Sequence, residues 1–251
     1  MIVEFIGPSG SGKTTLAREV ARLGAAHGFV EASDVVVGRA RMQRLSNSTA
    51  RNMVADLSAL IEIPRLDPDR RAFVRYALAS LGGSLPVSIR MFNYGRSVIR
   101  RTGMDSIAQR TAPDRIVLAD EGVLLSVYLL FVYGNRSHDV EELAGFLDVA
   151  PLPDRVIHVR APVATLEERA VSRSDPRPDI VDRRLRADRT VLDRAIETFD
   201  ALAASPNLAD RVHTIENSNG SPERLAELAG ELVETIDGWR AEILGMNGDE
   251  R

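Results

Sequence analysis

Residues 7–14 read GPSGSGKT and fit G-x-x-x-x-G-K-[ST], the spacing of a phosphate-binding loop. Glycines at 7, 10 and 12 let such a loop turn its backbone N–H groups inward around phosphate oxygens, and the N-terminus of the following helix adds its dipole. In this arrangement Lys13 reaches the β- and γ-phosphates of ATP, and the Thr14 hydroxyl binds Mg²⁺. We expect nucleotide contacts from Gly7, Ser9, Gly10, Ser11, Gly12, Lys13, Thr14 and Thr15.

Lys13 is the only lysine among the 32 basic residues of the chain; all the others are arginine. A compact ammonium on a flexible stem can fold back over a tight loop to reach two phosphates, whereas the broad, planar guanidinium of arginine cannot. The position therefore requires lysine by geometry. Guanine-specific GTPases need an [NT]-K-x-D segment, which a chain with one lysine at this position cannot contain.

A pair of acidic residues follows a second apolar run. Residues 115–122 read RIVLADEG, and an apolar strand ending in Asp120 predicts a carboxylate beside the magnesium ion. The predicted metal ligands are thus Thr14 and Asp120. Glu121 is either a catalytic base that orients the attacking group or an acid at the start of a helix, and the sequence leaves both readings open.

Three arginines gather in a lid-like segment at 165–179, TLEERAVSRSDPRPD. Arg169 and Arg173 share one helix face at i, i+4 spacing, and Arg177 follows in a Ser-Asp-Pro loop. Planar guanidinium groups bind phosphate through paired hydrogen bonds and stabilise charge on a phosphoryl group in transfer. A solvated charged helix is the alternative reading.

Strand and helix patterns alternate along most of the chain. Apolar strand candidates lie at 1–7, 29–38, 114–122, 154–162 and 210–218, and helical patterns at 13–27, 179–204 and 221–244. Because parallel neighbours need crossover connections, this alternation predicts an α/β fold with a five-stranded parallel sheet flanked by helices. Residues 40–112 show no convincing strand and predict a helical insertion within a single domain spanning 1–251.

Composition limits the classes of partner. Hydrophobic residues at 44% and charged residues at 27% suit a globular protein, and a net charge of −4 argues against general nucleic-acid binding. Cysteine is absent, which excludes disulfides, thiolate metal sites and cysteine nucleophiles. No secretory signal pattern is visible, and the longest apolar stretch, 122–134, is too short to cross a bilayer and reads as a buried helix. We expect a cytoplasmic protein without membrane contact.

The order of these parts resembles the P-loop nucleoside and nucleotide kinase family, which includes adenylate, thymidylate and gluconate-type kinases. The resemblance implies ATP and Mg²⁺ as cofactors, with Arg169 stacking on adenine and Arg173 contacting the transferred phosphate. It also implies that Asp34 acts as a base toward acceptor hydroxyls, and that the loop from Asn217 to Gly220 lines the adenine pocket.

Two segments depart from that family. Asp120-Glu121-Gly122 replaces the usual Asp-Arg or Asp-Gly-Tyr signature, and residues 91–101, MFNYGRSVIRR, match no member. Acceptor contacts are expected from the helical insertion, which would close over the acceptor. The candidates, each equally consistent with a core or surface role, are Arg90, Tyr94, Arg96 and Arg100.

Together these features predict an ATP-dependent kinase that transfers the γ-phosphate to a small-molecule acceptor, a nucleoside, nucleotide or other hydroxyl compound. The alternatives are a P-loop ATPase and a nucleotide-binding regulator, both dependent on a partner. The sequence is compatible with a monomer or a homodimer.

Overall fold

A computed structural model of the 251-residue chain describes residues 1–39, 48–84, 89–133, 139–172, 189–218 and 221–246. At its centre lies a five-stranded sheet with the order β2-β3-β1-β4-β5, in which every pair of neighbouring strands is parallel. The strands are β1 (Ile2–Ile6), β2 (Phe29–Glu31), β3 (Ile116–Ala119), β4 (Arg155–Arg160) and β5 (Val212–Glu216). The predicted fold class is confirmed.

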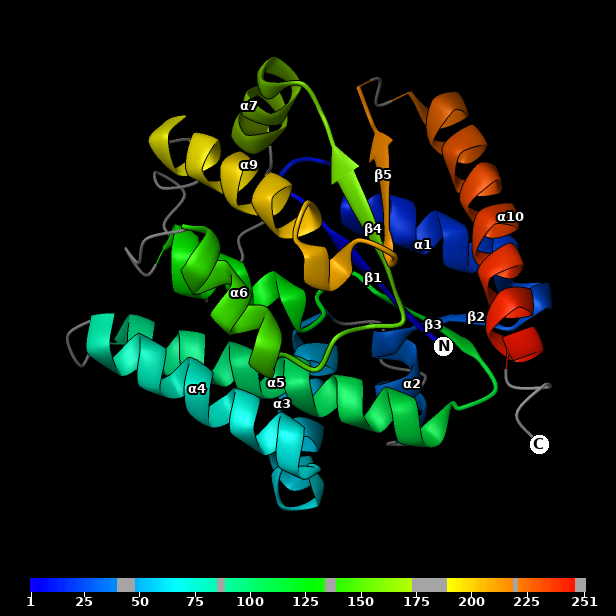
Figure 1. Ribbon diagram of the computed structural model, residues 1–251. Helices are drawn as coiled ribbons and strands as arrows, with labels where there is room; N and C mark the ends of the chain where they lie inside the picture. The colour runs from blue at the N-terminus through cyan, green and yellow to red at the C-terminus, as the bar shows by residue number, and fades with distance from the viewer. Residues whose placement is uncertain (40–47, 85–88, 134–138, 173–188, 219–220, 247–251) are drawn as a thin grey trace.

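One face of the sheet is covered by two helices from opposite ends of the chain. Helix α1 (Lys13–Leu23) packs beside α10 (Pro222–Met246), as Figure 1 shows. Leu16 and Val20 of α1 and Leu232 of α10 are buried against strand residues such as Phe5. The apolar stripe of α1, spaced at i and i+4, therefore faces the sheet.

Several helices lie on the other side of the sheet (Figure 1). They include α4 (Pro68–Ser84), α5 (Ile89–Thr111), α6 (Val140–Val149) and α9 (Arg189–Ala203). Four phenylalanines fill the core between these helices and the sheet. Their rings pack edge to face: Phe73 and Phe131 against Phe146, and Phe199 against Tyr128.

The connection between β2 and β3 is helical wherever the structure describes it. It contains α2 (Ala32–Arg39), α3 (Ser48–Glu62), a short 3₁₀ turn at Ile63–Arg65, α4 and α5. Helix α5 packs along α3, α4 and α2. The segment predicted to be an insertion therefore forms a helical layer beside the sheet.

The second predicted strand, 29–38, is wrong in its extent. Strand β2 ends at Glu31 and helix α2 begins at Ala32, so Asp34 lies in the first turn of a helix and not at a strand end. The three consecutive valines at 35–37 suggest a strand, but Val36 and Val37 are buried by helical packing against neighbouring elements. An acid in the first turn also suits the helix dipole.

The long apolar stretch forms a buried helical connection after β3. It comprises a 3₁₀ turn, Leu124–Ser126, and a π-helical turn, Tyr128–Val132, and its side chains are buried throughout. Helix α7 (Val163–Ser172) follows β4. In the part of the chain that the structure describes, no helix combines the length and apolar character needed to span a bilayer.

Candidate active site

The phosphate-binding motif connects β1 to α1, and its shape depends on glycine. Gly7, Gly10 and Gly12 all have positive φ angles, of 139°, 90° and 92°. A Cβ atom on Gly7 would lie 2.3 Å from the Val159 carbonyl oxygen, and one on Gly12 would lie 2.3 Å from Asn217 Nδ2. The loop is therefore held tightly between the ends of β4 and β5, with a backbone that only glycine adopts readily.

Lys13 folds back over this loop. Its ammonium group donates a hydrogen bond to the Pro8 carbonyl oxygen at 3.2 Å. Thr14, one residue further along α1, donates from its hydroxyl to the Asp120 carboxylate at the end of β3. The glycine loop, the Lys13 ammonium group and the Asp120 carboxylate thus meet at the carboxyl ends of the central strands, where parallel α/β sheets bind their ligands.

Three side chains brace the loop from different elements. The Ser9 amide donates to the hydroxyl of Tyr128, Asn217 Nδ2 donates to the Ser11 carbonyl at 2.8 Å, and Arg169 Nη1 donates to the Gly10 carbonyl at 3.1 Å. Arg169 and Asn217, predicted to contact adenine, lie here against loop carbonyls. Of the other predicted loop contacts, Ser11 is buried and Thr15 is exposed on α1.

Thr14 and Asp120 suit the magnesium site predicted for them. Burial, and then the charge of Glu121, raises the pKa of Asp120, whereas the hydrogen bond from Thr14 lowers it. A divalent cation would favour the ionised carboxylate. Nowhere in the described ranges do three or more His, Asp or Glu side chains gather around one possible metal position. Mg²⁺ would therefore take its further ligands from phosphate oxygens and water, as is usual for this ion.

Glu121 is held by an arginine from the helical layer. Arg100 of α5 donates from Nη2 to Glu121 Oε2 at 2.6 Å, with the Arg100 side chain 12% exposed and that of Glu121 28% exposed. Arg100 also lies 3.9 Å from Asp56 of α3. The ion pair fixes the Glu121 carboxylate beside Asp120.

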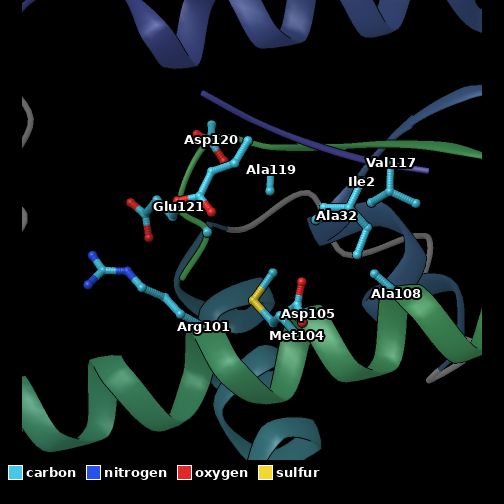
Figure 2. A pocket seen from close by; sticks show the side chains of 12 residues that line it. Ile2, Ala32, Arg101, Met104, Asp105, Ala108, Val117, Ala119, Asp120 and Glu121 are labelled. Atoms are coloured by element: carbon cyan, nitrogen blue, oxygen red, sulfur yellow. The ribbon is translucent and has the colours of Figure 1, made fainter. Parts of the chain in front are cut away.

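A small cavity opens next to these two acids (Figure 2). Ile2, Ala32, Ala108, Val117 and Ala119 form its apolar wall, and α5 contributes Arg101, Met104 and Asp105. Glu4, Asp120, Glu121 and Gly122 complete the lining. The space open to the centre of a water-sized group is about 30 Å³.

Glu4 is a site residue that sequence reasoning missed. It is 2% exposed on the central strand, and its two carboxyl oxygens accept the backbone N–H groups of Leu124 and Leu125 at 3.2 and 3.0 Å. Burial raises its pKa to about 8. A Cβ atom on Gly122 would lie 2.3 Å from Glu4 Cδ, so Glu4 fixes the turn that carries Asp120 and Glu121. The available signal was a lone acid inside an apolar strand.

Arg101 was also missed, although it neighbours a predicted contact. It is 5% exposed, and its Nε and Nη1 atoms have no hydrogen-bond partner in the residues that the structure describes. Burial lowers its pKa to about 10, with the charges of Glu121, Glu4 and Asp120 opposing that shift. It remains a cation at neutral pH.

The remaining predicted residues lie apart from this cavity or outside the described side chains. Asp34 is exposed on α2 and does not line the cavity. Tyr94 is buried in the core beside Tyr133, and Arg96 pairs with Asp56 at 3.3 Å. The side chain of Arg90 and the predicted catalytic residues Arg173 and Arg177 fall outside the described part of the chain.

A second cavity, of about 220 Å³, adjoins the phosphate loop at Pro8. His158 of β4 lines it and is 2% exposed, with Nε2 3.6 Å from the Asp200 carboxylate. Burial lowers the pKa of His158 to about 4, so the imidazole is neutral at physiological pH.

Comparison with known proteins gives similarities in structure only. No protein-family model and no curated protein matches the chain. Among solved structures, thymidylate kinase from Ehrlichia chaffeensis is similar with a TM-score of 0.48 and 16% identity, over 94% of this chain and 98% of that one. Deoxyadenosine kinase from M. mycoides, solved with bound dATP, is similar with a TM-score of 0.46 and 14% identity, over 93% of this chain and 100% of that one.

Proposed function

We propose that the chain is an ATP-dependent phosphotransferase that moves the γ-phosphoryl group of Mg-ATP to a small-molecule acceptor. The observation that supports this most directly is one arrangement: Lys13 folded over a glycine loop, Thr14 bonded to Asp120, and a cavity bordered by Asp120 and Glu121. Phosphoryl transfer needs positioning and charge stabilisation more than covalent chemistry. These groups can supply both.

In this proposal the loop amides and Lys13 bind the phosphates of ATP. Thr14 and Asp120 hold Mg²⁺, which when bound neutralises charge on the β- and γ-phosphates. Arg173 and Arg177 are proposed to stabilise the moving phosphoryl group. Arg169 buttresses the Gly10 carbonyl from the start of the same segment.

We assign the role of base to Glu121 and not to Asp34. Glu121 lines the cavity and is oriented by Arg100, whereas Asp34 is exposed on α2 outside the lining. A base must reach the acceptor proton within hydrogen-bonding distance. The acceptor oxygen would attack the γ-phosphorus, its proton would pass to Glu121, and ADP would leave.

The test is ADP release measured with nucleosides, nucleoside monophosphates, sugars and aminoglycosides as acceptors. We expect slow ATP hydrolysis by the protein alone and faster ADP release with an acceptor, together with a phosphorylated product. Hydrolysis that rises only with DNA, lipid vesicles or a protein partner would instead indicate the ATPase or regulator alternatives.

The matched variants are Lys13→Arg and Arg22→Lys. Lys13→Arg should lower turnover by about 100-fold or more, the effect expected when a group that stabilises the transferring phosphoryl charge is lost. Its circular dichroism spectrum should be unchanged. Arg22 lies on the same helix and forms an ion pair with Glu19 at the protein surface. Because such surface pairs contribute little, Arg22→Lys should leave turnover unchanged. Full activity in Lys13→Arg would overturn the proposed mechanism.

A further inference from the structure

The hydroxyl of Tyr128 lies against the phosphate loop. Tyr128 begins the π-helical turn that follows β3, and its hydroxyl oxygen accepts a hydrogen bond from the Ser9 amide, 119 positions away in the chain. Because the backbone N–H is the donor of this bond, the hydroxyl can donate its own proton to a second acceptor. Ser9 is only half-buried, so a bound phosphate can reach this part of the loop.

One peptide unit connects this hydroxyl with Lys13. The Pro8 carbonyl oxygen accepts from the Lys13 ammonium group at 3.2 Å, and the N–H group of the same peptide, which belongs to Ser9, donates to Tyr128. In a loop of this kind the lysine reaches the β- and γ-phosphates. In the proposed function this peptide therefore lies beside the terminal phosphates, and so does the Tyr128 hydroxyl.

The connection that carries Tyr128 also carries the acids of the site. Strand β3 ends at Ala119, Asp120 and Glu121 follow, and two buried helical turns lead from there to Tyr128 and beyond. The connection thus begins at the proposed base and touches the phosphate loop at Tyr128. A phosphoryl group that moves between the loop and Glu121 would pass beside this connection.

Two aromatic rings hold Tyr128 in place. Tyr133 stacks on it with ring centroids 5.4 Å apart, and Phe199 of α9 meets it edge to face at 5.1 Å. The π-helical turn at this position is a rare geometry that frequently occurs at functional sites. A donor fixed by packing in a partly desolvated place stabilises developing charge without having to reorganise. The Tyr128 hydroxyl meets this requirement.

We propose that Tyr128 is a catalytic residue, whose hydroxyl donates a hydrogen bond to a non-bridging oxygen of the γ-phosphoryl group. This inference rests on the proposed function and adds a neutral donor to the charged groups assigned there. In phosphoryl transfer, charge is spread over the three equatorial oxygens of the moving group, so a fixed donor to one of them stabilises the transition state. Tyr128 keeps its proton throughout: the acceptor oxygen bonds to the γ-phosphorus, the bond from that phosphorus to the β–γ bridging oxygen breaks, and ADP leaves.

The first experiment separates a contact with the γ-phosphate from a role in shaping the loop. Mg²⁺ complexes of ADP and of the non-hydrolysable analogue β,γ-imido-ATP are titrated by calorimetry into the natural protein and into Tyr128→Phe. A residue that only shapes the loop affects the binding of both nucleotides, whereas a contact with the γ-phosphate affects the analogue alone. We expect Tyr128→Phe to raise the Kd for the analogue about tenfold, the loss of one hydrogen bond to a charged group, and to leave the Kd for ADP unchanged.

Tyr76→Phe is the control for this experiment. It removes the same hydroxyl group from α4 and should change neither Kd. Thermal unfolding verifies that both variants are folded at the titration temperature. Equal loss of affinity for the two nucleotides in Tyr128→Phe, or no loss for either, overturns the inference and leaves the proposed function standing. If the natural protein binds neither nucleotide, the proposed function fails and the inference fails with it.

The second experiment measures the transition-state contribution. Steady-state ADP release is followed at saturating Mg-ATP with an acceptor that the screen shows to be active. Tyr128→Phe should lower kcat about tenfold or more, because one donor to the transferring phosphoryl group is lost, and should leave the KM for the acceptor unchanged. Tyr76→Phe should keep the natural kcat. A natural kcat in Tyr128→Phe overturns the catalytic role, whereas the absence of any active acceptor would already have refuted the proposed function.

Discussion

Two buried ionisable groups, Glu4 and His158, should give the protein an unusual dependence of stability on pH. Burial raises the pKa of Glu4 from 4.5 to about 8 in the folded protein. Between these values the folded protein holds a proton that the unfolded chain has lost, so stability falls as the pH rises. The slope from one such group is about 1.4 kcal/mol per pH unit. Ionisation of Glu4 therefore lowers the free energy of unfolding by up to about 5 kcal/mol between pH 4.5 and 8, and its effect is constant above pH 8.

His158 acts in the opposite direction over a lower range. Its pKa falls from 6.5 to about 4 on burial, so between these values the unfolded chain binds the extra proton. Stability contributed by this group therefore rises with pH up to 6.5 and is constant above. From pH 4.5 to 6.5 the two slopes nearly cancel. Above pH 6.5 only the Glu4 slope remains, and about 2 kcal/mol should be lost by pH 8.

The assay is urea unfolding at intervals between pH 5 and 9, compared between the natural protein and Glu4→Gln. Glu4→Gln keeps an acceptor oxygen but cannot ionise, so its stability should not share the fall above pH 6.5. Burial also raises the pKa values of Asp105 and Asp120. Both residues are present in the two proteins, so their contributions cancel when the unfolding free energies are subtracted. His158→Gln should alter the slope only below pH 6.5. Equal slopes for the natural protein and Glu4→Gln between pH 6.5 and 8 would refute this reasoning.

Two further substitutions test the packing around the site. Gly122→Ala should destabilise the protein by about 1–3 kcal/mol, because the added methyl group would clash with the Glu4 side chain. Gly145→Ala on α6 is the control and should be neutral or stabilising, because open space surrounds that position. Thermal unfolding measures both, and equal unfolding temperatures for the two variants would contradict the predicted clash. Tyr128→Phe removes the hydroxyl that accepts a hydrogen bond from the Ser9 amide, and should lower the free energy of unfolding by about 1–3 kcal/mol. It should also weaken ATP binding measured by calorimetry. An unchanged Kd for ATP would show that the loop holds its shape without this bond.

The features that the sequence predicts correctly are those determined locally. Strand β1, the glycine loop and helix α1 lie within the first 23 residues, and each is specified by its own apolar period or by its glycines. The alternation of strands and helices then restricts the sheet to a parallel arrangement. The closing helix was predicted at 221–244 and runs from Pro222 to Met246.

The features that the sequence leaves open depend on contacts between distant segments. The valines at 35–37 suit a strand as well as a buried helix, and only packing by α3 and α5 selects the helix. Arg101 looks like an ordinary helix residue, and Glu4 stands out only as a lone acid inside an apolar strand. Their burial beside one cavity follows from placing β1 against α5, a relation that neither local pattern contains.

The bond between Asn217 and the Ser11 carbonyl joins residues 206 positions apart in the chain. During synthesis the glycine loop is made well before β5 and the Asn217 that braces it. Because Gly12 packs directly against the Asn217 amide, the loop cannot take its final shape until β5 has paired with β4. We therefore expect a growing chain to acquire nucleotide affinity only as its sheet is completed, so that nucleotide binding reports the last stage of folding and not the first.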